Sequence, residues 1–198
     1  IRSAQTNDEN QLMETASLTG HFIIAMPSLT DSYFDQSVTY ICEHDGNGAF
    51  GIVINHETDI TLDEILPDVD LSPENSSNHN QTLFIGGPVQ QDRGFILHKT
   101  SGEWKSTLKI DDKMSLTTSR DILESIAKNE GPIDNIIALG YAGWGPGQLE
   151  QEFLDNSWLS CPADESIIFS TPVKQRFQSA ADIIGVDMST ISNDTGHA

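Results

Sequence analysis

The chain is poor in several kinds of residue, and each shortage excludes a class of protein. Its 198 residues include two cysteines, Cys42 and Cys161, which form no CxxC pair and no disulfide framework. No apolar run approaches the roughly 18 to 20 residues that a membrane helix needs. No basic stretch followed by an apolar one marks a secretory signal. These absences predict a soluble, cytoplasmic protein.

Basic residues are also scarce, and their scarcity bears on nucleic acids. The chain has 10 Lys and Arg against 30 Asp and Glu, a formal charge of −20. Residues 1–92 contain a single base, Arg2, whereas seven of the ten bases lie between Arg93 and Lys128. DNA-binding surfaces place Lys and Arg on phosphates, and a chain of this charge repels a polyanion at long range. Direct DNA binding is therefore disfavoured, although a local basic face within 93–128 stays open.

The chain does contain enough apolar residues to form one core, since they make up 37% of its length. Apolar and β-branched runs predict strands over 21–29, 37–44, 49–55, 82–87, 94–99, 104–110, 136–142 and 166–170. Helical spacing predicts helices over 60–66, 119–128, 148–154 and 172–184.

Turn chemistry and composition divide the chain further. The sequence Asp45-Gly46-Asn47-Gly48 between two strands predicts a hairpin, because these residues tolerate positive φ. Residues 1–17 are polar and aperiodic, which predicts a disordered lead-in, and 67–81 read as a surface loop. Strand groups followed by strand–helix alternation predict one α+β domain with a mixed sheet over 18–198.

Two glycine-rich turns could form a site. Gly140–Gly147 joins a strand to a helix, where phosphates often bind. It lacks both the Gly-Lys-Ser/Thr of a P-loop and the third glycine of a dinucleotide fingerprint, since Gln148 occupies that position. Gly86-Gly87-Pro88 ends a strand with two permissive residues and one rigid residue. Each turn is open to two interpretations, a structural turn or a ligand-binding loop.

Polar residues give no recognisable catalytic motif. His44, between Glu43 and Asp45, suggests a general base, and His98 ends another strand. A satisfied turn or surface histidine is the alternative for each, and the one that the sequence favours. No histidines have the spacing of HExxH, and no cysteine lies near enough to suggest zinc, so no metal or cofactor is predicted. Ser37 and Cys42 are not in a nucleophile elbow. The catalytic residues stay unknown, and the balance favours a protein that is not an enzyme.

Five blocks in order resemble the YqgE/AlgH family of bacterial proteins. They are Gly20–Asn55, Phe84–His98, Leu116–Leu123, the run LGYAGWGPGQLEQEFLDNSWL at Leu139–Leu159, and the closing Gly196–Ala198. The resemblance covers nearly all of 18–198. It implies a compact α+β fold with a mixed, mostly antiparallel, partly barrel-like sheet and flanking helices.

The resemblance implies less about function. Members are commonly labelled transcriptional regulators, after one linked to control of alginate production, and no catalytic residues, cofactor or DNA contacts carry over. Polar and glycine positions within the matching blocks are candidates because they lie near turns: Asp31, Ser37, His44, Asn55, Gly86, Gly87, Pro88, His98, Trp144, Gln148 and Glu150.

Three hypotheses follow. The first is a regulator that acts indirectly, through a protein or small-molecule partner. The second is a small-ligand module or enzyme, with its site where the GGP turn, His98 and the GWGPGQLE loop converge. Its candidate binding residues are Gly86, Gly87, His98, Trp144, Gln148 and Glu150. The third is an assembly role, with strand edges joining a homodimer in place of a monomer.

Overall fold

The computed structural model describes residues 16–29, 33–72 and 80–191. Nearly all of the predicted disordered lead-in, much of the predicted 67–81 loop, Asp31 and the closing block at 196–198 lie outside the described residues. The family resemblance and the candidate turns fall almost entirely within them.

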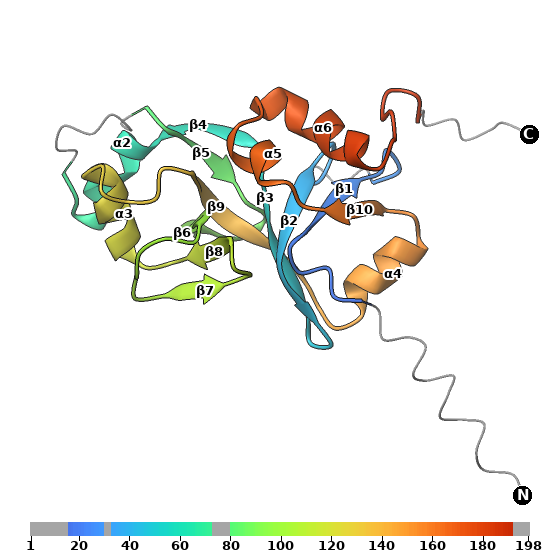
Figure 1. Cartoon of the computed structure of the whole chain (residues 1–198), viewed down its shortest axis with the longest axis horizontal. Helices are drawn as coiled ribbons and strands as arrows, with labels where there is room; N and C mark the ends of the chain where they lie inside the picture. Colours follow the sequence, from blue (N-terminus) through green and yellow to red (C-terminus); the bar gives the residue numbers. More distant parts are fainter. Residues whose placement is uncertain (1–15, 30–32, 73–79, 192–198) are drawn as a thin grey trace, which may run out of the picture.

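Ten strands form a curled sheet that runs through the middle of the molecule (Figure 1). Its path is β10-β1-β2-β3-β9-β6-β8-β7, and β5 joins β4 to β9 beside that path. The described strand pairs are antiparallel except β5 with β9, which is parallel. The strands are β1 (His21–Ala25), β2 (Val38–Asp45), β3 (Gly48–Val53), β4 (Glu57–Thr61), β5 (Thr82–Ile85), β6 (Val89–Lys99), β7 (Thr107–Lys109), β8 (Met114–Thr117), β9 (Asn135–Trp144) and β10 (Trp158–Pro162).

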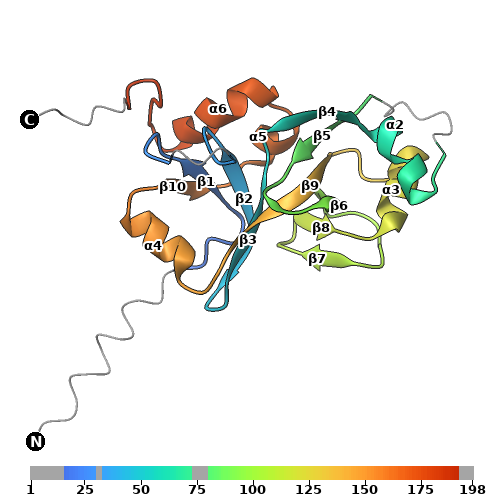
Figure 2. The same ribbon diagram turned by 180° about the vertical axis from the view of Figure 1, so that it is seen from behind.

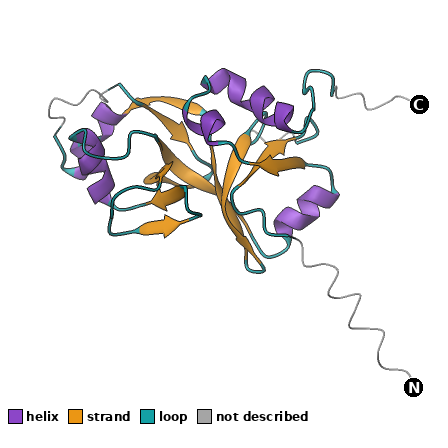
Figure 3. Ribbon diagram, viewed as in Figure 1, coloured by secondary structure: helices purple, strands orange, loops and turns teal. Residues whose placement is uncertain are grey.

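Helices flank the sheet at both ends and on one face (Figure 3). Helices α2 and α3 lie together at one end, α4 lies at the other, and α5 and α6 lie over the region of β1 and β2 (Figures 1 and 2). The bounds are α2 (Leu62–Ile65), α3 (Arg120–Ala127), α4 (Gln148–Leu154), α5 (Glu165–Phe169) and α6 (Arg176–Ile183), with 3-10 turns at Pro67–Val69 and Val173–Gln175. This arrangement confirms the α+β fold with a curled, mostly antiparallel sheet.

The β2–β3 hairpin confirms the turn prediction. Asp45 pairs with Gly48, and the Asp45 carboxylate accepts the Asn47 N–H at 2.7 Å. Gly48 has φ +128°, a conformation that L side chains rarely adopt. Asp45 and Gly48 therefore fix the turn that sets the register of the two strands.

Buried side chains form three clusters on the two faces of the sheet. The largest lies beneath α5 and α6, the second lies beneath α2 and α3, and the third lies beneath α4. In α3, Ile122, Leu123 and Ile126 are buried at helical spacing. Burial of each such side chain contributes about 1.5–3 kcal/mol, so the apolar stripe docks this helix.

Several element predictions were wrong. Residues 166–170 were predicted as a strand and instead form α5. The Asp164 carboxylate accepts the Ser166 N–H at 2.9 Å, and this N-cap starts a helix that buries Ile167 and Ile168 together. A short apolar run does not distinguish a strand from a buried helix by periodicity alone. Strands β4, β8 and β10 were not predicted. The last two residues of β4 were assigned to the helix over 60–66, and Pro162 weakens the strand pattern of β10.

The GGP turn brings two segments of backbone into direct contact. The Val53 N–H donates to the Gly86 carbonyl and the Gly86 N–H donates to the Leu139 carbonyl, both at 2.9 Å. A Cβ on Gly87 would overlap the backbone of Tyr141 in β9. Glycine is therefore required here by space.

Gly87→Ala is expected to lower the free energy of unfolding by about 3 kcal/mol, because backbone atoms cannot yield as a side chain can. Gly46→Ala is the matched control, since nothing lies within 4 Å of its added Cβ and its φ is not positive. The control is expected to change stability by less than about 0.5 kcal/mol. Urea denaturation of both variants measures the difference, and equal stabilities would contradict the close contact.

Candidate functional site

The GGP turn opens onto a shallow aromatic hollow. The rings of Phe50 and Tyr141 lie 6.0 Å apart and those of Phe95 and Tyr141 lie 5.3 Å apart, both edge to face. The Arg93 guanidinium lies 5.6 Å from the Phe95 ring centre. We call these four residues the aromatic surface. It lines a hollow of about 550 Å3 with Val89 and Gln90, just after the turn, and with Gly143 and Trp144.

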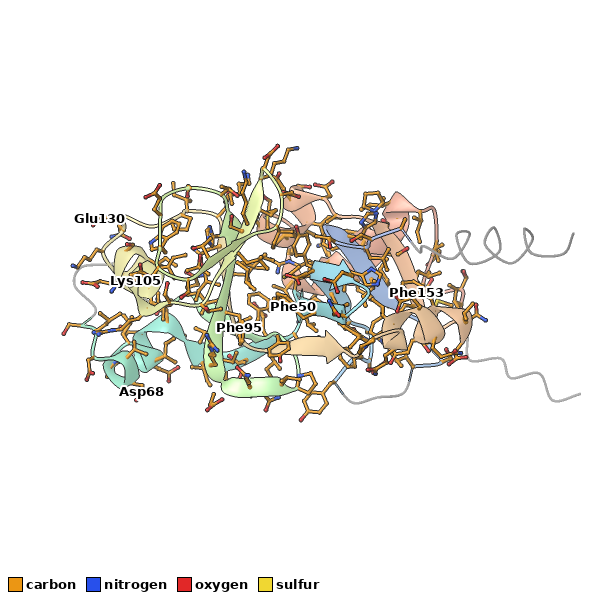
Figure 4. The ribbon with its side chains drawn as sticks, turned by 90° about the horizontal axis from the view of Figure 1, so that it is seen from below. Phe50, Asp68, Phe95, Lys105, Glu130 and Phe153 are labelled. Carbon is orange, nitrogen blue, oxygen red and sulfur yellow. The ribbon has the colours of Figure 1, made fainter. Side chains whose placement is uncertain are left out.

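This surface lies at the middle of the molecule. Phe50 and Phe95 appear between the end marked by Glu130 and Asp68 and the α4 end marked by Phe153 (Figure 4). Strand β6 bulges at the hollow, where its pairing with β9 shifts between Val89 and Gly94. Bulges redirect side chains and occur often beside sites.

The GWGPGQLE loop is held rigidly by its own side chains. Gln148 accepts the Gly145 N–H at 3.0 Å and donates to Glu152 at 3.1 Å. The other Glu152 oxygen accepts the indole N–H groups of Trp144, at 2.9 Å, and Trp158, at 2.7 Å. Sequence analysis missed Glu152, although its i, i+4 spacing from Gln148 was a signal for this pairing.

His44 and Glu150 meet at the foot of α4. The His44 Nε2 lies 2.7 Å from the Glu150 carboxylate, and Nδ1 accepts the Leu18 N–H at 3.0 Å. An accepting Nδ1 places the proton of neutral His44 on Nε2, which donates to Glu150. Both ring nitrogens are therefore engaged, and the histidine joins β2, α4 and the segment before β1.

The carboxylate of this pair is perturbed. Burial raises the pKa of Glu150, but the hydrogen bonds from His44 and from its own backbone N–H outweigh burial and lower the pKa overall. The folded state therefore stabilises the ionised form of Glu150.

His98 lies apart from the two glycine-rich turns. It pairs with Asn135 at the opposite end of β9 from Trp144, which is nine residues, or about 30 Å, along the strand. The structure therefore brings the GGP turn near Trp144, at one hollow, and does not bring His98 to it. Gln148 and Glu150 also point away into the α4 contacts described above.

His98 is fully buried within a chain of hydroxyl groups. Its Nδ1 donates to the Lys99 carbonyl at 2.8 Å, and its Nε2 accepts from Thr117, which in turn lies 2.8 Å from the Thr107 hydroxyl. Burial lowers the pKa of His98, and the Lys99 carbonyl bond opposes this only in part. The folded state therefore stabilises the neutral form of the His98 ring.

The remaining candidate residues lie at the following positions in the structure. Asn55 accepts the Val38 N–H at 2.9 Å and donates to the Gln36 carbonyl at 2.8 Å. Ser37 is fully buried, and its hydroxyl has no partner among the described residues. Pro88 is exposed beside the aromatic hollow, and Asp31 lies outside the described residues. The described part of the chain has no group of three or more His, Cys, Asp or Glu that could hold a metal ion.

The fold and these contacts define a single-domain α+β protein, with a curled half-barrel sheet and a shallow aromatic hollow at its centre. The sequence profile of the AlgH-like family matches residues 22–189, and the chain therefore belongs to that family. The resemblance inferred from the five blocks is confirmed.

Relatives match over almost the full chain. A UPF0301 protein of Thioalkalivibrio sulfidiphilus is 53% identical over 184 residues, which are 93% of this chain and 98% of the relative. A UPF0301 protein of Nitrosococcus oceani is 49% identical over 178 residues, 90% of this chain and 95% of the relative.

Solved structures share the fold. The solution structure of the AlgH protein from Pseudomonas aeruginosa matches with a TM-score of 0.77 and 42% identity over 100% of both chains. A crystal structure from Corynebacterium diphtheriae matches with a TM-score of 0.67 over 87% of this chain and 90% of the other, and at 20% identity it shows the fold alone. Within the described ranges, the chain has no helix long and apolar enough to cross a membrane.

The buried His98 predicts a pH dependence of stability. Because its folded pKa is below the ordinary value of 6.5, the unfolded chain binds the proton more readily. Stability is therefore complete above that value and falls as the pH drops towards the folded pKa. His98→Gln is expected to reduce this loss by up to about 1.4 kcal/mol per pH unit below the ordinary value.

Urea midpoints of both proteins, measured between about pH 7 and pH 5, report the difference. Other titrating groups are common to the two chains and cancel in the comparison. Identical pH dependence would show that the pKa of His98 is the same in the folded and unfolded states, and would contradict the effect of burial.

Proposed function

We propose that this AlgH-like chain is a non-catalytic regulatory protein that acts on transcription indirectly, by binding a protein partner at the aromatic surface. The open aromatic hollow around Tyr141 is the observation that carries the proposal. Transcription is proposed as the process because family members are commonly labelled transcriptional regulators. Indirect action is proposed because the charge distribution disfavours contact with DNA.

Of the nine basic residues in the described part of the chain, four form ion pairs and a fifth is buried. Four lysines lie near carboxylates: Lys99 with Asp134 and Glu165, Lys109 with Asp112, Lys113 with Glu165, and Lys128 with Glu124. Arg176 is buried and donates to backbone carbonyls of Ile54 and Thr171. Neutralised and buried cations release few counterions from a phosphate backbone, so they support little DNA affinity.

The aromatic surface has the composition of a protein-binding patch. Aromatic rings and arginine are the residues that most often dominate protein interfaces. The rings are half-buried or buried on β3, β6 and β9, so the surface is rigid before binding. Arg93 is exposed above Phe95 and supplies a positive charge within a chain of −20. The partner surface that fits is apolar, with a carboxylate for Arg93.

The indirect route is tested by fluorescence anisotropy of labelled mixed-sequence duplex DNA with the pure protein. No binding is expected at low or moderate salt, because the net charge is repulsive and about half of the described cations are paired or buried. Binding that falls steeply with salt would reveal a basic face and would overturn the indirect route.

The binding surface is tested by Arg93→Glu. Loss of an interface arginine commonly costs 2 kcal/mol or more, so capture of a specific partner by the immobilised protein is expected to fall by about 30-fold. Lys105→Glu makes the same charge change at another exposed base, near the α3 end (Figure 4). Capture from an extract is quantified for both variants by mass spectrometry. Equal capture by the two would contradict the assignment of the surface.

A further inference from the structure

A second hollow, of about 880 Å3, lies away from the aromatic surface. It is lined by Tyr40 from β2, by Lys99 at the end of β6, by the turn at 111–113 before β8, and by residues 162–166 at the start of α5. Its volume is within the range of small-molecule sites. None of the residues singled out from the sequence lines it.

Tyr40, which lines this hollow, has an unsatisfied hydroxyl. The residue is only 1% exposed, and its hydroxyl has no hydrogen-bond partner among the described residues. Burial raises the pKa of Tyr40, and the charges of Cys42, Asp111 and Glu165 raise it further, so the phenol stays an O–H donor. A buried donor without an acceptor costs stability, and a ligand acceptor would remove that cost.

Charged groups of both signs line the same hollow. The Lys113 ammonium is 3.9 Å from Glu165, and its side chain is 79% exposed, so it is only loosely held. Asp111 accepts the backbone N–H groups of Lys113 and Met114 through Oδ1, and within the described part of the chain its Oδ2 accepts no hydrogen bond. Asp112 also lines the hollow and is almost fully exposed. Donors and acceptors therefore face the same space.

These groups together disfavour a ligand that carries charge of one sign only. A plain anion would meet the carboxylates of Asp111, Asp112, Asp164 and Glu165, which outnumber the two lysines. A plain cation would leave the Tyr40 hydroxyl without an acceptor. A molecule that carries a carboxylate beside an ammonium satisfies both requirements.

We propose that this hollow binds a zwitterionic small molecule of the α-amino-acid class. The ligand carboxylate accepts from the Tyr40 hydroxyl and pairs with the Lys113 ammonium, and the ligand ammonium pairs with the Asp111 carboxylate. The site is separate from the aromatic surface, so its failure leaves the proposed partner binding unaffected.

Thermal unfolding of the full chain with each standard α-amino acid, at up to about 10 mM, tests the proposal, because a ligand of the folded state raises Tm by mass action. At least one amino acid is expected to raise Tm. Its N-acetyl derivative and its methyl ester, which each lack one of the two charges, are expected to give no shift. A shift with no amino acid, or an equal shift with a capped derivative, would overturn the zwitterion site.

Variants locate the binding. Tyr40→Phe removes a hydroxyl that has no partner, so its unliganded Tm is expected to equal or exceed that of the wild type, while the ligand shift is lost. Lys113→Ala changes an exposed side chain and is expected to weaken binding by about tenfold. Tyr33→Phe and Lys128→Ala, outside the hollow, are the matched controls and keep the full shift. A shift that survives in Tyr40→Phe and Lys113→Ala would place the ligand elsewhere and overturn the proposal.

Discussion

The arrangement of the sheet depends on the contact between the GGP turn and β9. Gly86 and Gly87 bring their backbone against Gly140 and Tyr141 with no room for a Cβ. That contact seats the end of β5 beside β9, and β9 is the strand that pairs with β3, β5 and β6. The same approach lays Val89 and Gln90 at the edge of the aromatic hollow. A steric constraint on two glycines thus fixes both the fold and the surface that we propose as functional.

Local patterns were sufficient to predict much of the fold. The Asp-Gly-Asn-Gly turn, the apolar stripe of α3 and the helix at 148–154 were predicted correctly, because each depends on neighbours in the sequence. Strand β10 was not, because its apolar run is short and its partner β1 lies far along the chain. Helix α5 was not, because a short apolar run does not by itself distinguish a buried helix from a strand. The barrel-like curl came only from the family resemblance.

The sites were harder to predict than the fold. Phe50, Phe95 and Tyr141 read as core residues in strands, and only their convergence from β3, β6 and β9 leaves them at a surface hollow. Tyr40 likewise reads as a core residue, and nothing in its neighbours shows that its hydroxyl lacks a partner. Conversely, His98 ends a strand as a catalytic group might, but β6 runs away from the glycine-rich turns. Residue type identified candidates, whereas strand direction decided which of them meet.

The strand order has a consequence for the order of events during synthesis. Strand β1 lies between β2 and β10, and β3 lies between β2 and β9. The three amino-terminal strands β1, β2 and β3 therefore form a unit whose two outer edges are covered only by strands from the last third of the chain. Such long-range pairing closes late, and uncovered edges are prone to pair with other chains. The nascent chain therefore exposes two strand edges until residues 135–162 leave the ribosome, which makes this interval the one in which a chaperone has the most to protect.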